Sequence, residues 1–184
     1  RPVPTRSVQK PIAGGVRGGR LSLATAAGAR HQDVHQEASP ALSTWGPGIA
    51  YSRLLRMKSG PEVGLPSLVV ECELCFAWEM EDDRTFVFYL RDEVRWQDLE
   101  PVKGRSLVAE DLVFSYARQS QAEFPNAGLL QGVKDMEATG PGVVRFTLTV
   151  PDADFLLSLA DGRSKVVARE AVELSGDLKN GPTV

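Results

Sequence analysis

The sequence predicts a mixed fold, α/β to α+β, and three observations support this. Segments with the two-residue alternation of strands are interspersed with segments of helical period, and predicted strands are often neighbours in the chain. Hydrophobic residues make up 42% of the 184 residues and charged residues 24%, which excludes a disordered chain, a coiled coil and a collagen-like fibre. No apolar run approaches the roughly 18 residues that span a bilayer, so no transmembrane helix is expected.

The N-terminal third of the chain carries an excess of positive charge. Residues 1–60 hold nine Lys and Arg and two acidic residues, a net charge of +7, whereas residues 61–184 have a net charge of −10. Residues 1–19 combine like charge with glycine and proline, so we expect a disordered basic tail there. No aromatic side chain lies among these charges to stack on bases, so nucleic acid is not an expected partner.

Order is expected to begin near Arg20. Residues 21–27 contain small and branched side chains and predict a short strand, whereas residues 31–40 are polar and predict a loop. The apolar spacing over residues 41–55 is typical of a helix, which Pro47 must break or kink.

The pattern over residues 78–96 is the most informative. Residues 78–85 predict the end of a strand and an acidic turn, residues 86–90 predict a second strand, and Val94 and Trp96 are expected to continue the pairing. A β-hairpin or meander is the natural interpretation. Alternation along the strand predicts that three side chains are buried on one face: Phe86, Phe88 and Leu90.

Residues 59–66 contain two prolines and two glycines, which predict a linker and a first domain boundary. The C-terminal half of the chain again alternates helical and strand patterns. Its predicted elements are a helix over 106–118, strands over 133–138 and 143–149, a short helix with 155–159 on its buried side, a strand over 166–168, a helical turn over 169–174 and an open coil over 176–184.

No catalytic constellation is present in the sequence. A nucleophile elbow, a phosphate-binding glycine loop followed by Lys-Ser/Thr, and a His-Glu-x-x-His helix are all missing. Acidic pairs are plentiful, but most lie at predicted turns, where solvated carboxylates are expected. The chain is therefore predicted not to be an enzyme, and no catalytic residue or cofactor is assigned.

The strongest metal-like signal is Cys72-x-x-Cys75 together with His31-x-x-x-His35, because four such ligands suit a tetrahedral zinc site. Two simpler interpretations compete: a small disulfide in an oxidising compartment, or two free, half-buried thiols. We favour free thiols and assign no metal. A zinc-binding module or metal-dependent enzyme that uses these four residues is one alternative function, and a structural or interaction domain without a ligand is another.

Seven segments together form a specific pattern. They include an aromatic strand followed by a helix with the motif Ala-Glu-Asp-Leu-Val-Phe-Ser, and they cover residues 33–36, 51–56, 74–79, 85–91, 94–96, 109–116 and 144–151. The combination resembles the family 5 extracellular solute-binding proteins, which are the oligopeptide- and dipeptide-binding components of ABC transporters. The resemblance covers roughly residues 20–180.

Four departures from the family pattern are visible. Val34 replaces the usual proline after Asp33, residues 98–105 lengthen a usually tight turn, and Cys72 and Cys75 are not part of the general pattern. The chain also ends where the family's Gly-Thr-Gly-Pro-Tyr segment begins. We therefore expect an N-terminal fragment from which the second ligand-binding lobe is absent.

The resemblance implies part of a periplasmic-binding-protein type II fold, in which two lobes close on a solute. Residues 20–58 and 150–184 would belong to lobe I, and residues 59–149 would form an inserted α+β subdomain. It also implies an extracytoplasmic protein that binds a peptide or another small solute and delivers it to ABC transporter permease subunits. Contact with a membrane is expected only through the permease or an N-terminal anchor upstream of the chain.

The resemblance also implies where the ligand binds. The family's first-lobe contacts follow the Asp-Pro-His segment, where main-chain groups pair with an extended peptide as if a strand were added. The matching positions are Glu37, Ala38, Ser39 and Pro40, and the Glu37 carboxylate is a candidate partner for a peptide's amino group. From the residues alone, Trp45 best fits a core or rim position, but next to this loop it is expected to form a wall of the cleft.

Overall fold

The structure is a computed structural model that describes residues 18–20, 22, 24, 26, 28–60, 63–64 and 68–181. Most of the basic tail predicted over residues 1–19 lies outside these ranges, and so do residues 21, 23, 25 and 27 of the strand predicted over 21–27. The described residues between 18 and 30 belong to no strand.

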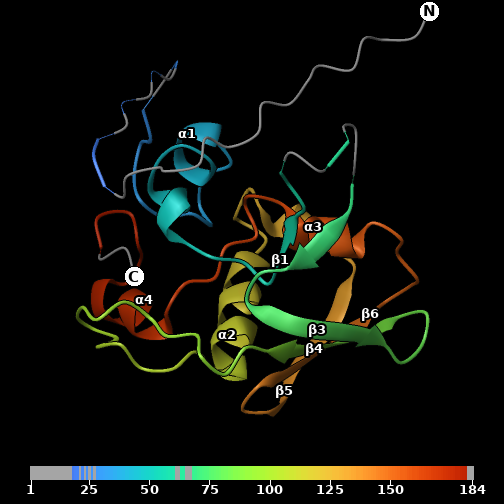
Figure 1. Ribbon diagram of the computed structural model, residues 1–184. Helices are drawn as coiled ribbons and strands as arrows, with labels where there is room; N and C mark the ends of the chain where they lie inside the picture. The colour runs from blue at the N-terminus through green and yellow to red at the C-terminus, as the bar shows by residue number, and fades with distance from the viewer. Residues whose placement is uncertain are drawn as a thin grey trace, which may run out of the picture.

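The centre of the fold is a four-stranded antiparallel sheet (Figure 1). Its strands, in the spatial order β3-β4-β6-β5, are β3 (Cys75–Met80), β4 (Thr85–Leu90), β6 (Val143–Leu148) and β5 (Val133–Gly140). Helix α2 (Ala109–Gln119) packs against β5 and β6. The predicted hairpin, the predicted α2 helix and the two strands near residue 140 are thus confirmed.

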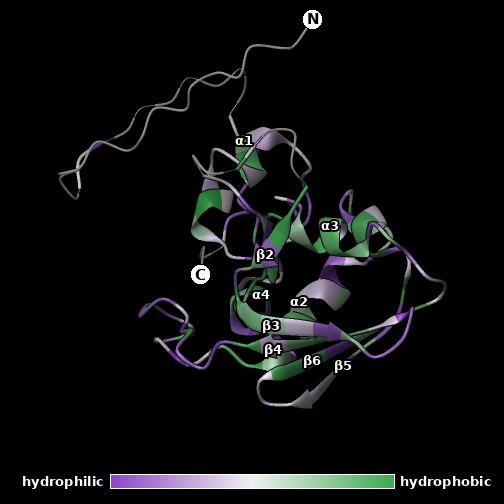
Figure 2. Ribbon diagram, turned by 45° about the vertical axis from the view of Figure 1, so that its right-hand side comes forward, coloured by the Kyte–Doolittle hydropathy of each residue, from purple (hydrophilic) through white to green (hydrophobic). Residues whose placement is uncertain are grey.

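Strand β4 forms the middle of the main core. Its residues Phe86, Phe88 and Leu90 are all buried, as the alternation predicts. Val87, on the opposite face, is buried as well, beside Arg145 and Glu79 of the two neighbouring strands. Figure 2 shows hydrophobic residues on the central strands and on α3 (Phe155–Ala160), with hydrophilic residues along the surrounding loops.

The helix predicted over residues 41–55 is interrupted before Pro47, as the sequence indicates, but its continuation to residue 55 is wrong. The chain forms a short helix α1 (Pro40–Ser43), a 3-10 turn η1 (Pro47–Ala50) and then strand β1 (Leu55–Met57). At Gly48 an added Cβ would lie 2.4 Å from the Ser43 carbonyl oxygen, so the chain turns back too tightly there for a regular helix. Leu55 leaves the helical pattern because it pairs with Cys72.

Strand β1 pairs with β2 (Val70–Cys72) in a separate two-stranded sheet. The segment predicted as a linker over residues 59–66 therefore lies within the connection of a hairpin, and both strands of that hairpin contact the main core. The division into a lobe over 20–58 and 150–184 and a subdomain over 59–149 stays a prediction.

Two further strand predictions need correction. Val94 and Trp96 do not pair with the sheet but with residues 105–107: the Leu107 N–H donates to the Val94 carbonyl oxygen and the backbone N–H of Trp96 to the Arg105 carbonyl oxygen, on either side of a bridge between Arg95 and Ser106. Residues 166–168 are extended but join no sheet. The Val167 N–H donates instead to the Ser115 hydroxyl, 2.9 Å away. The final helical turn is confirmed as α4 (Arg169–Ser175).

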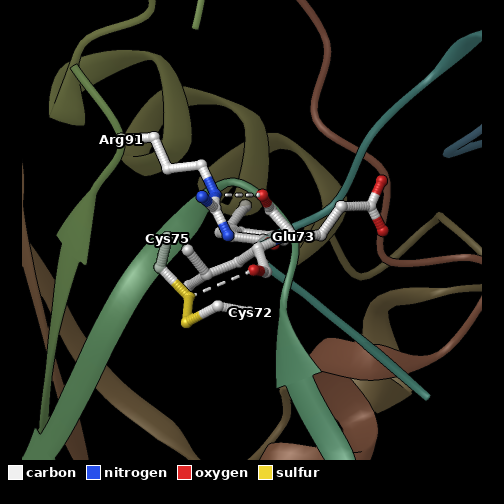
Figure 3. Close-up of a disulfide and its surroundings, with 6 residues drawn as sticks. Cys72, Glu73, Cys75 and Arg91 are labelled. Atoms are coloured by element: carbon white, nitrogen blue, oxygen red, sulfur yellow. Dashed lines mark hydrogen bonds between the residues drawn. A yellow bond between two sulfur atoms is a disulfide. The ribbon is translucent and has the colours of Figure 1, made fainter. Parts of the chain in front are cut away.

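Cys72 and Cys75 form a disulfide (Figure 3). The turn between β2 and β3 brings their Cα atoms to 5.0 Å, within the range that a disulfide requires. The Glu73 carbonyl oxygen in this turn accepts a hydrogen bond of 3.1 Å from Nε of Arg91, and Cys75 Sγ lies 3.5 Å from the Leu54 carbonyl oxygen. The favoured interpretation of two free thiols is therefore wrong, and the disulfide alternative holds.

Candidate functional site

The polar loop over residues 31–40 lies on a second, smaller hydrophobic cluster. The cluster consists of Val34, Leu42, Tyr51, Val102, Val167, Ala168, Ala171 and Leu178. Val34 comes from the loop itself and Leu42 from α1, directly after the loop. The loop therefore has one side toward the interior, where its polar groups need partners.

An ion pair inside the protein supplies some of these partners. The Arg118 guanidinium, at the end of α2, binds both carboxylate oxygens of Asp33, and both side chains are almost fully buried. Nη1 of Arg118 also donates to Nδ1 of His35 at 2.9 Å. His35 Nε2 is 2.8 Å from the Lys165 carbonyl oxygen, so the neutral tautomer with hydrogen on Nε2 satisfies both contacts.

The cluster shifts two pKa values strongly. Burial raises the pKa of Asp33, but the hydrogen bonds and charge of Arg118, with the N–H groups of Leu178 and His35, outweigh it and lower that pKa to about 2. Burial lowers the pKa of His35 to about 4, and the Arg118 charge acts in the same direction. At neutral pH the cluster therefore holds an Asp33 carboxylate, an Arg118 cation and a neutral His35.

A pH dependence of stability follows from His35. Because its folded pKa of about 4 lies below the unfolded value of 6.5, the unfolded state binds more protons between these values, and stability falls as the pH falls. We expect the free energy of unfolding to drop by about 2 kcal/mol between pH 7.5 and pH 5. Urea unfolding at several pH values measures this drop. In the His35→Gln variant the free energy of unfolding should depend much less on pH over the same range. An unchanged slope in that variant would contradict the assignment to His35.

Asn126 holds the loop at a second place. Its buried Nδ2 lies 3.0 Å from the Val34 carbonyl oxygen, 3.4 Å from that of His35 and 3.2 Å from that of Glu37. Asn126 precedes the 3-10 turn η2 (Ala127–Leu130), which comes after α2. The loop is thus held by Arg118, in the last turn of α2, and by Asn126, in the segment that follows this helix.

The structure turns the Glu37 carboxylate back onto its own loop. It accepts hydrogen bonds from the Arg30 backbone N–H, at 3.3 Å, and from the Ser39 hydroxyl. Ser39 precedes α1, and its carbonyl oxygen accepts the N–H groups of Leu42 and Ser43. These contacts give Glu37 and Ser39 a role in shaping the loop, so the Glu37 carboxylate is already engaged.

Ala38 is different from its neighbours. It is exposed, and within the described part of the chain neither its N–H nor its C=O forms a hydrogen bond. Pro40 is also exposed, and its carbonyl oxygen accepts the Trp45 N–H at 3.0 Å. The structure thus brings Trp45 beside the start of α1, close to the loop.

Trp45 is 54% exposed, so the core position that its residue type favours is wrong. Trp78 and Trp96 are partly buried against the main core, as predicted for core or rim aromatics. The exposed Trp45 indole is a surface that a ligand can cover, and the backbone of Trp45 is bonded to Pro40 at the end of the loop.

The predicted zinc alternative is also wrong. Cys72 and Cys75 are used in the disulfide, and His35 binds Arg118 and the Lys165 carbonyl oxygen. Among the residues that the structure describes, no group of three or more His, Cys, Asp or Glu side chains is placed to hold a metal ion.

Sequence reasoning missed Arg118 and Asn126. Arg118 lies three residues after Ser115, on the buried side of α2. A cation on the buried side of a helix needs a partner, and this position could have indicated a buried ion pair. Asn126 lies between predicted elements in a turn-like stretch, where its residue type is ordinary, and nothing local marks it.

Comparison with known proteins places the chain among bacterial binding proteins. Residues 44–183 match the model of the bacterial extracellular solute-binding proteins, family 5 Middle. The dipeptide-binding protein of Escherichia coli is 32% identical over 135 residues, which are 65% of this chain and 24% of that protein. Heme-binding protein A of Haemophilus influenzae is 31% identical over 124 residues, 59% of this chain and 22% of that protein.

Solved structures agree in fold. The binding protein MoaA from A. tumefaciens R10, in complex with mannopinic acid, superposes with a TM-score of 0.66 at 25% identity, over 83% of this chain and 31% of that one. Haemophilus influenzae OppA in complex with the peptide RPPGFSPFR gives a TM-score of 0.67 at 18% identity, over 82% and 31%. The fold is part of a type II periplasmic binding protein, as predicted. The chain spans about a quarter of the length of the relatives above.

Proposed function

Because the chain belongs to the bacterial extracellular solute-binding proteins of family 5, we propose that it forms one wall of a peptide-binding cleft that serves an ABC transporter. The observation that carries this proposal is the exposed backbone of Ala38, whose N–H and C=O have no partner within the described residues. An extended peptide can pair with such groups as an added strand does. Trp45 is joined to Pro40, two residues after Ala38, by a backbone hydrogen bond, and its exposed indole offers an apolar surface to a peptide side chain.

The proposed role is binding without catalysis. Members of the family are solute-binding proteins, and the chain carries no recognisable catalytic motif. The family is extracytoplasmic, and a disulfide between Cys72 and Cys75 is suited to an oxidising compartment. No helix in the described ranges is both long and apolar enough to cross a membrane. Permease subunits of the transporter are the proposed macromolecular partners.

We expect Ser39→Pro to weaken peptide binding. Ser39 has φ −70° and ψ 142°, angles that proline adopts, so the fold should keep its stability. The substitution removes the Ser39 N–H, which has no partner in the described part of the chain. We place this N–H with the two backbone groups of Ala38 among the proposed contacts to the peptide, and the loss of one such hydrogen bond corresponds to an affinity roughly three- to tenfold weaker. The measurement is an NMR titration of the ¹⁵N-labelled 184-residue chain with trialanine.

Two controls accompany this titration. Ser39→Ala removes the same hydroxyl but keeps the N–H, so it should bind more tightly than Ser39→Pro. Replacement of Asp82 and Asp83 by alanine, in the exposed turn between β3 and β4, should leave affinity unchanged. If trialanine shifts no amide resonance of residues 37–39 and no resonance of Trp45 in the unsubstituted chain, the proposed site is wrong.

A further inference from the structure

One buried side chain contacts three carbonyl groups of the proposed ligand loop. Asn126 is only 1% exposed, and its Nδ2 donates toward the carbonyl oxygens of Val34, His35 and Glu37. These residues are between 89 and 92 positions away in the sequence. The side chain does not cap η2, the turn that it precedes, so its amide is directed entirely to the loop.

The orientation of this amide is determined by its surroundings. A reversed amide would place Oδ1 against three carbonyl oxygens, which are all acceptors. In the observed orientation Oδ1 is buried without a hydrogen-bond partner among the described groups, so the amide contributes as a donor only. The backbone of Asn126 is held separately, since its carbonyl oxygen accepts the Leu129 N–H at 3.2 Å.

Asn126 reaches a part of the loop that the buried ion pair does not. Arg118 holds the side chains of Asp33 and His35, whereas the Glu37 carbonyl is bound by Asn126. The next fixed point along the chain is the Ser39 carbonyl oxygen, which α1 engages. Ala38 therefore lies between two residues whose carbonyl groups are hydrogen-bonded, Glu37 and Ser39. Asn126 binds the carbonyl oxygen of Glu37.

We infer that Asn126 is a positioning residue for peptide binding, which fixes the backbone at Ala38 in the geometry that an extended peptide requires. The inference rests on the function proposed above and adds a residue that does not touch the ligand. A preorganised loop loses less conformational entropy when the ligand binds, so affinity depends on a side chain beneath the surface.

The test is Asn126→Ala in the 184-residue chain, with two readouts. We expect the ¹⁵N order parameters of residues 37–39 to fall from about 0.85 to below about 0.6. We also expect the dissociation constant for trialanine to rise about tenfold, since two or more hydrogen bonds that fix the loop are lost. Asn126→Ser keeps a polar side chain, but its hydroxyl ends one bond short of the Nδ2 position and should lose the same contacts. It should therefore give the same direction of change in both readouts, and it provides a second variant should the alanine variant fold poorly.

Two control variants separate positioning from general stability. Asn180→Ala makes the same chemical change at the other asparagine of the chain, which is exposed, and should change neither readout. Val144→Ala removes a fully buried side chain from β6, so it should lower stability but leave trialanine affinity and the loop order parameters unchanged. A loss of affinity in Val144→Ala as large as in Asn126→Ala would overturn the inference.

The two proposals fail in different ways. If the unsubstituted chain does not bind trialanine, the proposed function is wrong. In that case unchanged order parameters in Asn126→Ala would show that the inference is wrong as well. If trialanine binds and Asn126→Ala leaves both affinity and order parameters unchanged, the proposed function stands and the positioning role is overturned.

Discussion

Replacement of Phe88 by alanine should lower the free energy of unfolding by about 3–5 kcal/mol, the usual cost of deleting a buried aromatic side chain. Phe88 is fully buried in β4, in the middle of the sheet. Its ring lies 5.6 Å from that of Phe146 in an edge-to-face arrangement and 6.4 Å from that of Trp78. Helix α2 and α3 enclose this region, so the cavity that the substitution leaves cannot collapse easily.

The matched control is Phe76→Ala on the neighbouring strand β3. Phe76 is 62% exposed, and its aromatic contact is with Tyr89 at 6.1 Å on the outer face of the sheet. The same chemical change there should cost less than about 1 kcal/mol. Urea unfolding of both variants at pH 7.5 measures the difference. Equal losses at the two positions would contradict the assignment of Phe88 to the core.

The elements that the sequence predicts correctly are those in which local pattern and tertiary packing agree. β4 alternates large apolar residues and is buried in the middle of a sheet, and α2 has its acidic residues Glu110 and Asp111 at the N-terminus. The helix predicted over residues 41–55 fails because pairing across a hairpin overrides the apolar spacing at Leu55. Residues 166–168 have strand-like composition, but their partners are Ser52 and Ser115 rather than a strand.

The candidate site is predictable only in part. The resemblance to a family predicts ligand contacts over residues 37–40, and this assignment stays a prediction; the structure shows that Ala38 and Pro40 are exposed there. The groups that support the loop are distant in the sequence: Arg118 is 85 positions from Asp33, and Leu178 is 145 positions from it. A local sequence pattern therefore cannot predict these contacts. His35 is a second example. Its spacing from His31 suggested a zinc ligand, but its ring nitrogens bind Arg118 and the Lys165 carbonyl oxygen, which are both distant in the sequence.

The support of this loop by a buried ion pair leads to the second large effect. Arg118→Leu should lower the free energy of unfolding by about 3–5 kcal/mol, because the Asp33 carboxylate then stays buried without its cation. Asp33 is fully buried, and beyond Arg118 its remaining partners include the backbone N–H groups of Leu178 and His35. Loss of Arg118 also removes the donor to His35 Nδ1, so both buried groups lose a partner.

A control and a pH series make this prediction specific. Arg163→Leu breaks the pair with Asp161, in which the arginine is 37% exposed, and should cost less than about 1 kcal/mol. Burial raises the pKa of Asp33, and without Arg118 the main group that lowers this pKa is lost. The pKa of Asp33 therefore rises, and the folded variant binds a proton more readily. The gap in stability between Arg118→Leu and the unsubstituted chain should therefore narrow as the pH falls from 7 toward 4. A gap that stays constant over this range, or a loss no larger than that of Arg163→Leu, would show that the buried carboxylate is not what Arg118 stabilises.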